Sequence, residues 1–414
     1  MIKMQAENKK SNIKTLSFGC RLNALESEKI KNMLDQHMEV AIVVNTCAVT
    51  AEAERQSGQA VRRIARENPN VALFVTGCAA TRNPKLFLNV SNAIVISNHD
   101  KMKLNVYLGQ QTNIEKPEIL KFNHKDTKLS KQFVQIQNGC NHNCAYCITR
   151  QLRGVAVSFE YENILRDVQQ AVCDGFGEIV LTGVDLASYV QKEGDKIYLI
   201  SDLCRRLLAD VSGIERLRLS SVDPAVPDID NVIDLILSEP RMMPHLHFSM
   251  QSGSDTILRA MGRRHTAQRV RDLVARGAGK ITFSWDIICG FPGETDNLFY
   301  ETMALANEVK PIKIHAFPFS PRPHTLAANM PEQVDRSVSK KRVKLLTDLA
   351  NKNRAEFMRT RTGTVVQVLA EENNVARCPH DIAVRIQGQN IPARTICNVV
   401  LNGIDGDYFV GNLI

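Results

Sequence analysis

The residues of this chain with the clearest chemical potential lie in one octet, Cys-Asn-His-Asn-Cys-Ala-Tyr-Cys, at positions 140–147. Its cysteines follow the spacing Cys-x3-Cys-x2-Cys. Three thiolates can hold three irons of a [4Fe–4S] cube and leave the fourth iron open. Clusters that only carry electrons normally have protein ligands at all four corners, so this spacing predicts a cluster that binds a small molecule at its open iron.

A zinc knuckle is the alternative use of the same cysteines. Zinc sites of this kind need four ligands, commonly cysteines in Cys-x2-Cys pairs with or without histidine. His142 is available as a fourth ligand, but it stands between Cys140 and Cys144, where we expect it to face solvent or to pack. The octet therefore favours an iron–sulfur cluster held by Cys140, Cys144 and Cys147.

Three more cysteines each follow an apolar stretch in the first part of the chain. Short buried strands are predicted at 15–18, 40–44 and 71–75, with helical patterns at about 25–38 and 51–67. This alternation predicts a small parallel α/β domain, and ligands of such sheets bind beyond the carboxyl ends of the strands. We therefore expect Cys20, Cys47 and Cys78 to converge on a second metal site; the alternative is three buried small side chains.

A second, longer strand–helix alternation begins near residue 133. Its strands are predicted at 133–137, 178–183, 216–221, 245–250, 286–290 and 313–317. Six such units are typical of a partial parallel barrel, open on one side, with its active loops at the carboxyl ends of the strands. Polar and apolar residues alternate in several strands, so the polar faces either line a cofactor cavity or are satisfied in the core.

Residues at or just past these strand ends are the candidates for binding a cofactor. They are Gly183, Ser221, Gln251, Arg264 and Gly290. For each of them a turn or packing role is the alternative. Beyond the cluster-binding cysteines we predict no separate catalytic residue.

The last part of the chain changes character. A helical stretch at about 331–361 is rich in lysine and arginine, and the residues after it show β patterning typical of a small β-barrel. Residues 98–130 are polar and irregular and are interpreted as a linker. The predicted domains are 1–125, 126–330, a basic helical connector at 331–361, and 362–414.

Composition excludes several classes of protein. The 414 residues are 44% hydrophobic and 23% charged, as in ordinary globular proteins, and no apolar run approaches the ~20 residues of a membrane span. The first residues contain no apolar signal core, so we expect a cytoplasmic protein. Eleven cysteines in such a chain argue against a disulfide framework. The net charge of +8 permits a nucleic-acid partner without establishing one.

With these motifs, the chain resembles the radical S-adenosylmethionine (SAM) methylthiotransferases along almost its whole length. The segments Asn45–Val49 and Thr76–Ala79 resemble that family's auxiliary-cluster domain, and the octet with Arg153-Gly154 resembles its radical-cluster motif. The barrel signatures correspond to 178–184, 217–221, 245–253, 261–266, 286–295 and 317–325. The resemblance implies an N-terminal parallel α/β domain, a central open partial (β/α)6 barrel of the TIM-like radical SAM type, and a small C-terminal TRAM-like β-barrel.

Within the family, the chain is most similar to the branch that acts on N6-threonylcarbamoyladenosine in tRNA. The segment Gly19–Asn23, with Glu26 and Glu28 after it, favours this branch, as do Arg263–Thr266 and Pro321–Pro323. The chain departs from the family pattern at Arg150, where the family usually has proline, at Val157, where it has arginine, and at His324, where it has glycine. Cys20 and Cys47 are also closer together than is usual.

The resemblance implies two [4Fe–4S] clusters and SAM as cofactors. The cluster at Cys140, Cys144 and Cys147 would cleave SAM to a 5′-deoxyadenosyl radical, which activates carbon 2 of the adenine. The cluster at Cys20, Cys47 and Cys78 would present a sulfur that a second SAM methylates. The methylthio group is then inserted at position 37 of the tRNA.

The implied partners are a tRNA anticodon loop, whose bases can be splayed out, and a low-potential electron donor of the flavodoxin or ferredoxin type. We expect a monomer without a membrane partner. The basic helix and the terminal barrel are predicted to bind the RNA. Arg62, Arg63 and Arg66 are further candidates for phosphate contacts, with a solvated helix face as the alternative.

Two other functions stay open on the sequence alone. One is methylthiolation of an aspartate in a ribosomal protein. The other is an iron–sulfur or RNA-binding protein with impaired catalysis, which Arg150 and Val157 motivate.

Overall fold

The computed structural model describes residues 12–109, 129–388 and 390–414. These residues belong to two compact units. The N-terminal unit consists of the first part of the chain together with residues 147–154, and the second unit contains residues 129–146 and everything from residue 155 onward. Each unit is described separately below.

A four-stranded parallel sheet forms the centre of the N-terminal unit. Its strands, in spatial as in chain order, are β1 (Asn12–Ser17), β2 (Val40–Thr46), β3 (Leu73–Gly77) and β4 (Ala93–Val95). All residues of β3 and all but the first of β2 are buried. Such continuous burial is expected when helices cover both faces of a parallel sheet.

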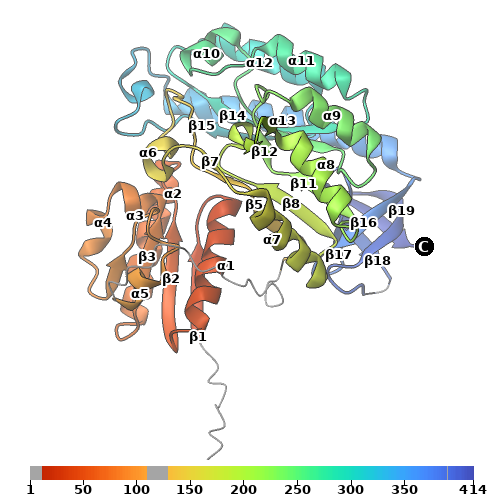
Figure 1. The fold of residues 1–414 in the computed structure, drawn as a ribbon. Helices are drawn as coiled ribbons and strands as arrows, with labels where there is room; N and C mark the ends of the chain where they lie inside the picture. The colour runs from red at the N-terminus through yellow and green to blue at the C-terminus, as the bar shows by residue number, and fades with distance from the viewer. Residues whose placement is uncertain (1–11, 110–128, 389) are drawn as a thin grey trace, which may run out of the picture. The chain divides into compact units, whose positions relative to one another are not determined.

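Helices cover the two faces through separate hydrophobic clusters (Figure 1). One face packs against α1 (Arg21–Asp35) and α5 (Leu104–Leu108). The other packs against α2 (Ala51–Glu67), α3 (Cys78–Arg82), α4 (Lys85–Leu88) and α6 (Thr149–Arg153). The start of α2 is set by Thr50, whose side chain accepts a hydrogen bond from the amide of Ala53.

Parallel strands in chain order form the barrel of the second unit (Figure 1). They are β5 (Gln132–Gln135), β8 (Glu178–Thr182), β11 (Arg216–Leu219), β12 (Ser221–Val222), β13 (His245–Gln251), β14 (Thr282–Cys289) and β15 (Lys313–Pro318). A bridge between Leu217 and Met242 joins the two sheets of this set. The open parallel barrel predicted from the sequence is therefore confirmed.

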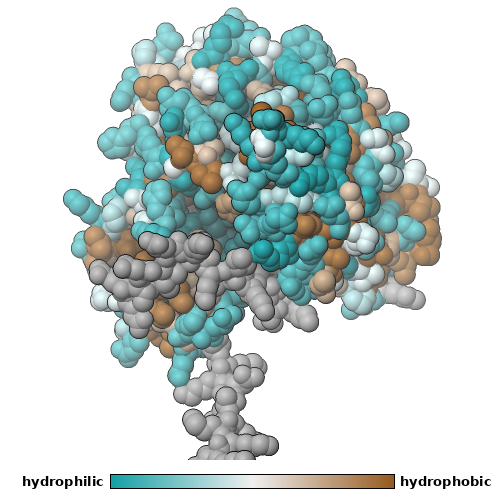
Figure 2. All heavy atoms as spheres, in the orientation of Figure 1, coloured by the Kyte–Doolittle hydropathy of each residue, from teal (hydrophilic) through white to brown (hydrophobic). Residues whose placement is uncertain are grey.

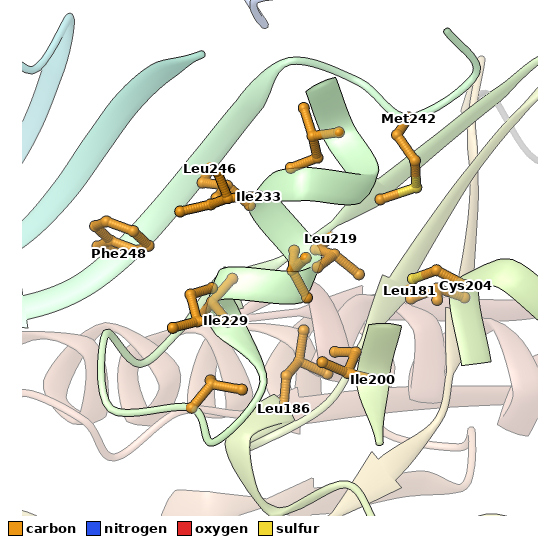
Figure 3. Close-up of a cluster of buried hydrophobic side chains, with 14 of the residues drawn as sticks. Leu181, Leu186, Ile200, Cys204, Leu219, Ile229, Ile233, Met242, Leu246 and Phe248 are labelled. Carbon is orange, nitrogen blue, oxygen red and sulfur yellow. The ribbon is translucent and has the colours of Figure 1, made fainter. Parts of the chain in front are cut away.

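Helices between these strands cover the outside of the barrel. They are α7 (Tyr161–Cys173), α8 (Ile200–Asp210), α9 (Ile229–Ser238), α10 (Asp255–Ala260), α11 (Ala267–Arg276) and α12 (Asp296–Val309). Short additional elements are β6 (Gln137–Asn138), β7 (Val157–Ser158), β9 (Gln191–Glu193), β10 (Lys196–Tyr198) and the 3-10 turns Leu186–Ser188 and Leu326–Asn329. Figure 3 shows strand residues such as Leu246 and Phe248 meeting the helix residues Ile229 and Ile233. Each such side chain contributes about 1.5–3 kcal/mol when fully buried.

Buried polar side chains at the start of the barrel strands pair with one another inside the core. Glu178 lies at the start of β8, where its carboxylate pairs with Arg216 at 2.8 Å and with Arg218 at 3.0 Å. His245 bonds to Thr282 and Ser284 on the neighbouring strand. Both groups lie at the amino ends of the strands, the end of a parallel barrel that serves stability rather than catalysis.

The Glu178 carboxylate is expected to make the second unit sensitive to acid. Burial by itself raises the pKa of Glu178, but the guanidinium groups of Arg218 and Arg216 outweigh it and lower that pKa to about 2. A lowered pKa gives stability that is present above the ordinary value of 4.5 and is lost as the pH falls toward 2. Trp285, the single tryptophan of the chain, is fully buried in this unit and reports its unfolding by fluorescence.

Between about pH 6 and about pH 3, the urea midpoint read from Trp285 should fall less in Glu178→Gln than in the unaltered protein, because glutamine takes up no proton. An equal fall in both proteins would exclude Glu178 as a source of the acid sensitivity.

A long helix and a closed β-barrel complete the chain. The helix is α13 (Arg336–Arg361), and the barrel strands are β16 (Val365–Ala370), β17 (Val375–Arg377), β18 (Ala383–Gln387), β19 (Ile396–Asp405) and β20 (Tyr408–Leu413). They close in the order β16-β17-β18-β20-β19, which confirms the predicted small barrel. Figure 2 shows hydrophobic surface over this barrel near the C-terminus, where Val365, Leu413 and Ile414 are exposed.

One interpretation of the sequence was wrong. Residues 98–109 are not a linker, because Lys101 and Tyr107 are buried in the N-terminal unit and α5 lies within this stretch. The remainder of the predicted linker up to residue 128 lies outside the described residues. The domain boundaries at 125, 330 and 361 stay predictions. Among the described helices, none is both long and apolar enough to cross a membrane.

Candidate metal centres

The cysteines of the N-terminal unit stand at the carboxyl ends of three adjacent parallel strands. Cys20 precedes α1 just after β1, Cys47 follows β2 directly, and Cys78 follows β3 as the first residue of α3. The strands are in register at these ends, with Ser17 opposite Asn45 and Thr46 opposite Gly77. Since neighbouring strands lie about 4.8 Å apart, the three thiols share one edge of the sheet. Cys47 and Cys78 are buried there and Cys20 is exposed.

Two glycines let the backbone pass close to this edge. Gly19 has φ +87°, and a Cβ on it would lie 2.5 Å from the sulfur of Cys47. Gly77 has φ +95°, and its Cβ would lie 2.3 Å from the carbonyl oxygen of Thr46. Any other residue at either position would clash and would be strained.

Buried side-chain hydrogen bonds hold the cysteine-bearing loops. Asn23 of α1 donates to the carbonyl oxygens of Phe18 at 2.9 Å and Thr46 at 3.1 Å. Asn45 donates back to the carbonyl of Asn23 at 2.9 Å, and Thr46 donates to Thr76 at 2.6 Å. These bonds tie together the ends of the three strands that carry the thiols.

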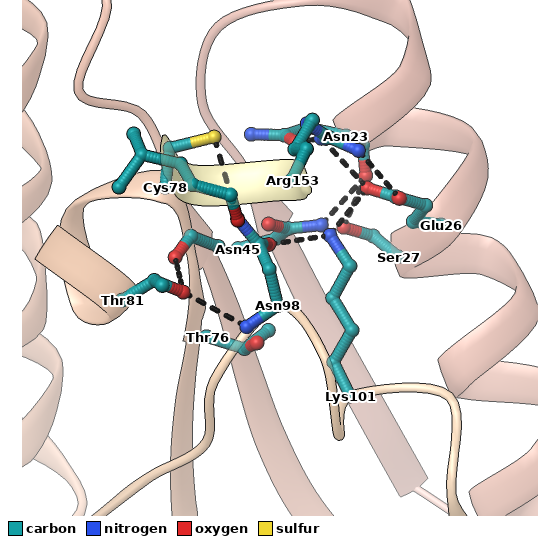
Figure 4. Close-up of polar contacts among 12 residues, drawn as sticks. Asn23, Glu26, Ser27, Asn45, Thr76, Cys78, Thr81, Asn98, Lys101 and Arg153 are labelled. Atoms are coloured by element: carbon teal, nitrogen blue, oxygen red, sulfur yellow. Dashed lines mark hydrogen bonds and ion pairs between the residues drawn. The ribbon is translucent and has the colours of Figure 1, made fainter. Parts of the chain in front are cut away.

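A buried ionic network lies directly behind Cys78 (Figure 4). The Glu26 carboxylate accepts hydrogen bonds from Lys101 at 2.5 Å and from Arg153 at 2.9 and 3.1 Å. Asn98 accepts from Lys101 at 2.9 Å and extends its amide nitrogen to 3.6 Å from the Cys78 sulfur. Two buried basic side chains face one carboxylate. Burial lowers the pKa of Lys101, and the Glu26 carboxylate opposes that fall. With Lys101 and Arg153 both protonated, the network has an excess of one positive charge beside the thiols.

The electrostatics of this edge fit a cluster with three thiolate ligands. Burial, with smaller contributions from Cys78 and Cys20, raises the pKa of the Cys47 thiol to about 11, while Arg153 acts in the opposite direction. Three neighbouring thiolates therefore require positive charge to form here. The network supplies part of that charge, and the iron of a cluster would supply the rest.

The octet divides between the two units. Cys140 and Cys144 belong to the second unit, after β6, and Cys147 begins the segment 147–154 of the N-terminal unit. Two of these thiols accept hydrogen bonds from backbone amides, Cys140 from His142 at 3.4 Å and Cys147 from Thr149 at 3.4 Å. Amides directed at sulfur favour the thiolate form that metal binding requires.

His142 does not extend into solvent but pairs with Asp185, which follows β8. The distance from its Nε2 to the Asp185 carboxylate is 2.7 Å. Cys140, His142 and Asp185 offer ligand atoms that all lie within 4.8 Å of one another. These are three donors rather than the four of a structural zinc site, and the pairing gives His142 a partner without a metal.

A partly buried arginine lies beside Cys144. One nitrogen of Arg263 is 3.8 Å from the Cys144 sulfur, and another donates to the carbonyl of Ser249 at 2.6 Å. The same guanidinium pairs with Asp223 at 3.2 Å. Asp185 and Asp223 were not among the sequence candidates, although both follow predicted strands closely, which was the available signal.

The candidate cofactor contacts lie mainly at the carboxyl ends of the barrel strands. Gly183, Ser221, Gln251 and Gly290 belong to or follow β8, β12, β13 and β14, and Arg264 lies in a loop after α10. Gln251 has φ +69°, a strained conformation for a residue other than glycine. Gly290 has a packing reason of its own, because a Cβ there would lie 1.9 Å from the Ser339 hydroxyl. Contact of these five residues with a cofactor stays a prediction.

Family comparisons agree with this arrangement. Residues 134–306 match the family described as Radical SAM superfamily, and residues 12–97 match uncharacterized protein family UPF0004. A radical SAM methyltransferase, TsrM from Kitasatospora setae, has a similar fold, with a TM-score of 0.57 over 77% of each chain at 14% identity. The fold and the octet thus define a radical SAM protein.

Full-length relatives narrow the class. The threonylcarbamoyladenosine tRNA methylthiotransferase MtaB of Rickettsia prowazekii is 36% identical over 95% of both chains. The enzyme of that name from Bacillus subtilis is 33% identical over 86% of this chain and 84% of its own. A tRNA-2-methylthio-N(6)-dimethylallyladenosine synthase from Thermoanaerobacter pseudethanolicus is 32% identical over 100% of this chain and 92% of its own. This chain belongs to the family of radical SAM tRNA methylthiotransferases, in its MtaB branch.

Proposed function

We propose that this protein inserts a methylthio group at carbon 2 of N6-threonylcarbamoyladenosine at position 37 of tRNA. The relatives named for threonylcarbamoyladenosine support this substrate, and they align with nearly the whole chain. The observation that carries the proposal is the alignment of Cys20, Cys47 and Cys78 at one edge of a sheet, in a chain that also contains the radical SAM octet.

The residues present fit two three-cysteine clusters. Cys140, Cys144 and Cys147 would hold one, and Cys20, Cys47 and Cys78 the other. When bound, the clusters and SAM supply the radical and the sulfur for breaking and replacing a carbon–hydrogen bond that acid–base chemistry does not reach.

The remaining site residues position these ligands and balance their charge. Asn23 and Thr46 fix the loops of the N-terminal unit. Arg263 beside Cys144 and the Lys101–Arg153 pair near Cys78 place positive charge close to thiolates. Cys47 and Cys78 are buried at this edge, whereas Cys20 is exposed.

The proposal extends to the partners. The tRNA would present its anticodon loop, a flavodoxin- or ferredoxin-type protein would deliver electrons, and the protein would act as a monomer in the cytoplasm. The basic helix α13 and the small barrel are the candidate RNA contacts.

Mass spectrometry of tRNA nucleosides tests the function. Deletion of the gene should remove 2-methylthio-N6-threonylcarbamoyladenosine and leave N6-threonylcarbamoyladenosine in its place. The intact gene should restore the modified nucleoside, and a gene encoding Cys47→Ala should not. An unchanged nucleoside profile in the deletion strain would refute the tRNA assignment. A mass loss on a ribosomal-protein aspartate in the same strain would favour the alternative substrate.

A further inference from the structure

The N-terminal unit contains a large groove that the proposed cluster chemistry does not use. Its volume is about 1330 Å³, and it lies between β1, α2 and the residues that follow α4. Phe18 and Leu86 contribute to its apolar wall, and Arg62, Arg63 and Arg66 contribute charge. The other polar residues of the lining are glutamine, asparagine and serine, and no carboxylate-bearing residue lines it.

Arg62 and Arg66 of the groove differ from the neighbouring arginines of α2 and α3. Arg55 of α2 pairs with Glu52 at 2.6 Å, and Arg82 pairs with Glu54. Within the described part of the chain, neither Arg62 nor Arg66 has a carboxylate partner. Arg63, which also lines the groove, has the Glu67 carboxylate at 4.0 Å, so the charges without a carboxylate partner inside the groove are those of Arg62 and Arg66.

An ordinary solvated helix face explains this pattern poorly. Outer helices of the second unit present a largely hydrophilic surface (Figure 2), where Arg269 pairs with Asp230 and Arg276 with Asp234. Arg66 lies in the last turn of α2, where the helix dipole stabilises a cation. Arg62 lies one turn earlier, so the dipole does not explain its position. The guanidinium of Arg62 lies back along the helix, with nitrogens 3.4 and 3.7 Å from the place of a Cβ on Gly58.

We propose that this groove binds the sugar–phosphate backbone of the tRNA substrate, away from the nucleotide that reacts. The proposal rests on the proposed function only for the identity of the RNA. Unpaired arginines attract phosphate, and amide and hydroxyl groups can bond to ribose. Arg62 is eleven residues beyond the start of α2, about 16 Å along its axis from the end that follows Cys47.

A contact at that distance from the reacting base should contribute equally to the bound substrate and to the transition state. The Arg62→Gln/Arg66→Gln double variant should therefore raise the KM for tRNA about tenfold and leave kcat unchanged. A residue that acted in the chemistry would lower kcat.

Equilibrium binding of full-length tRNA, followed by fluorescence anisotropy over a range of salt concentrations, gives an independent measurement. The double variant should bind about tenfold more weakly, and the slope of log K against log salt should fall by about 1.5 to 2, because two phosphate contacts are lost. Arg55→Gln is the matched control: it removes an arginine from the same helix that is paired and lies outside the groove, and it should match the unaltered protein.

Equal affinities for the double variant and Arg55→Gln would overturn the proposal. Unchanged tRNA binding with slower reduction by flavodoxin would also overturn it, in favour of an acidic protein partner. Methylthiolation by the unaltered protein tests the proposed function separately. The test of the groove depends only on differences in tRNA affinity and KM between variants.

Discussion

Replacing Cys47 with alanine is expected to lower the iron content of the anaerobically reconstituted protein from about eight to about four atoms per chain. The alanine leaves two thiols, Cys20 and Cys78, at the ends of β1 and β3, which are not neighbours in the sheet. Two ligands on strands separated by a third do not replace three that converge. Iron and sulfide analysis, together with electron paramagnetic resonance of the reduced protein, measures the loss.

The activities should separate in the same way. Cys47→Ala should still cleave SAM to 5′-deoxyadenosine but should transfer no methylthio group to tRNA. Cys144→Ala should lose both activities, because the octet then keeps too few ligands for the cluster that cleaves SAM.

Cys204→Ala provides the control for burial. Cys204 lies fully buried in the core of the second unit, within the hydrophobic cluster of Figure 3, and belongs to neither predicted metal site. Its replacement should leave about eight irons in place. Iron loss in Cys204→Ala equal to that in Cys47→Ala, or full iron content in Cys47→Ala, would contradict the assignment of the ligands.

Much of the frame of the site could be predicted from local sequence. The predicted helix at 51–67 matches α2, because Thr50 caps it and its apolar residues recur with helical period. The strands that carry the cysteines were predicted from apolar stretches, and a parallel sheet brings their carboxyl ends to one edge. The third predicted strand of this set begins at residue 71, whereas β3 begins at Leu73, a difference that leaves Cys78 at the strand end.

The charge behind the cysteines could not be predicted in this way. Glu26 is separated from Lys101 by 75 residues and from Arg153 by 127, so no local pattern links them. Lys101 lies in a polar stretch, and lysine is almost never fully buried unless it is paired, so the sequence predicts an exposed side chain. In the structure Lys101 is buried. Only tertiary structure reveals the partner that makes its burial possible.

The three departures from the family pattern, at Arg150, Val157 and His324, differ in their effect on the structure. His324, which stands where the family usually has glycine, adopts φ +68°. The backbone therefore keeps a conformation that glycine adopts readily, and this conformation is strained for histidine. Arg150 and Val157 are exposed, and neither alters the strand ends that carry the cysteines.

Glu26→Gln should have the largest effect on the stability of the N-terminal unit. The Glu26 side chain is 3% exposed, and it is the carboxylate that both Lys101 and Arg153 contact. Glutamine keeps the shape but leaves two buried cations without an anion. Breaking a buried pair by removing one partner costs about 3–5 kcal/mol, because the charge that stays behind is uncompensated.

Lys101→Met separates charge balance from simple loss of contacts. It leaves Glu26 paired with Arg153 in a one-to-one pair, whose two hydrogen bonds at 2.9 and 3.1 Å are unaffected. We therefore expect Lys101→Met to cost less than Glu26→Gln, although it removes the whole ammonium group. Lys103→Met is the matched control, because Lys103 is exposed and, among the described residues, pairs with Asp100 alone. Its effect should stay within about 0.5 kcal/mol.

Hydrogen exchange of the buried amides in β2 and β3, resolved by mass spectrometry, measures the opening free energy of this unit by itself. If Lys101→Met destabilised these strands as much as Glu26→Gln does, the network would act through packing rather than through charge balance. The Glu26→Gln/Lys101→Met double variant gives a second test, because it removes two charges of opposite sign and leaves one cation. Glu26 and Lys101 are in direct contact. The free-energy costs of the two single variants should therefore add up to more than the cost of the double variant.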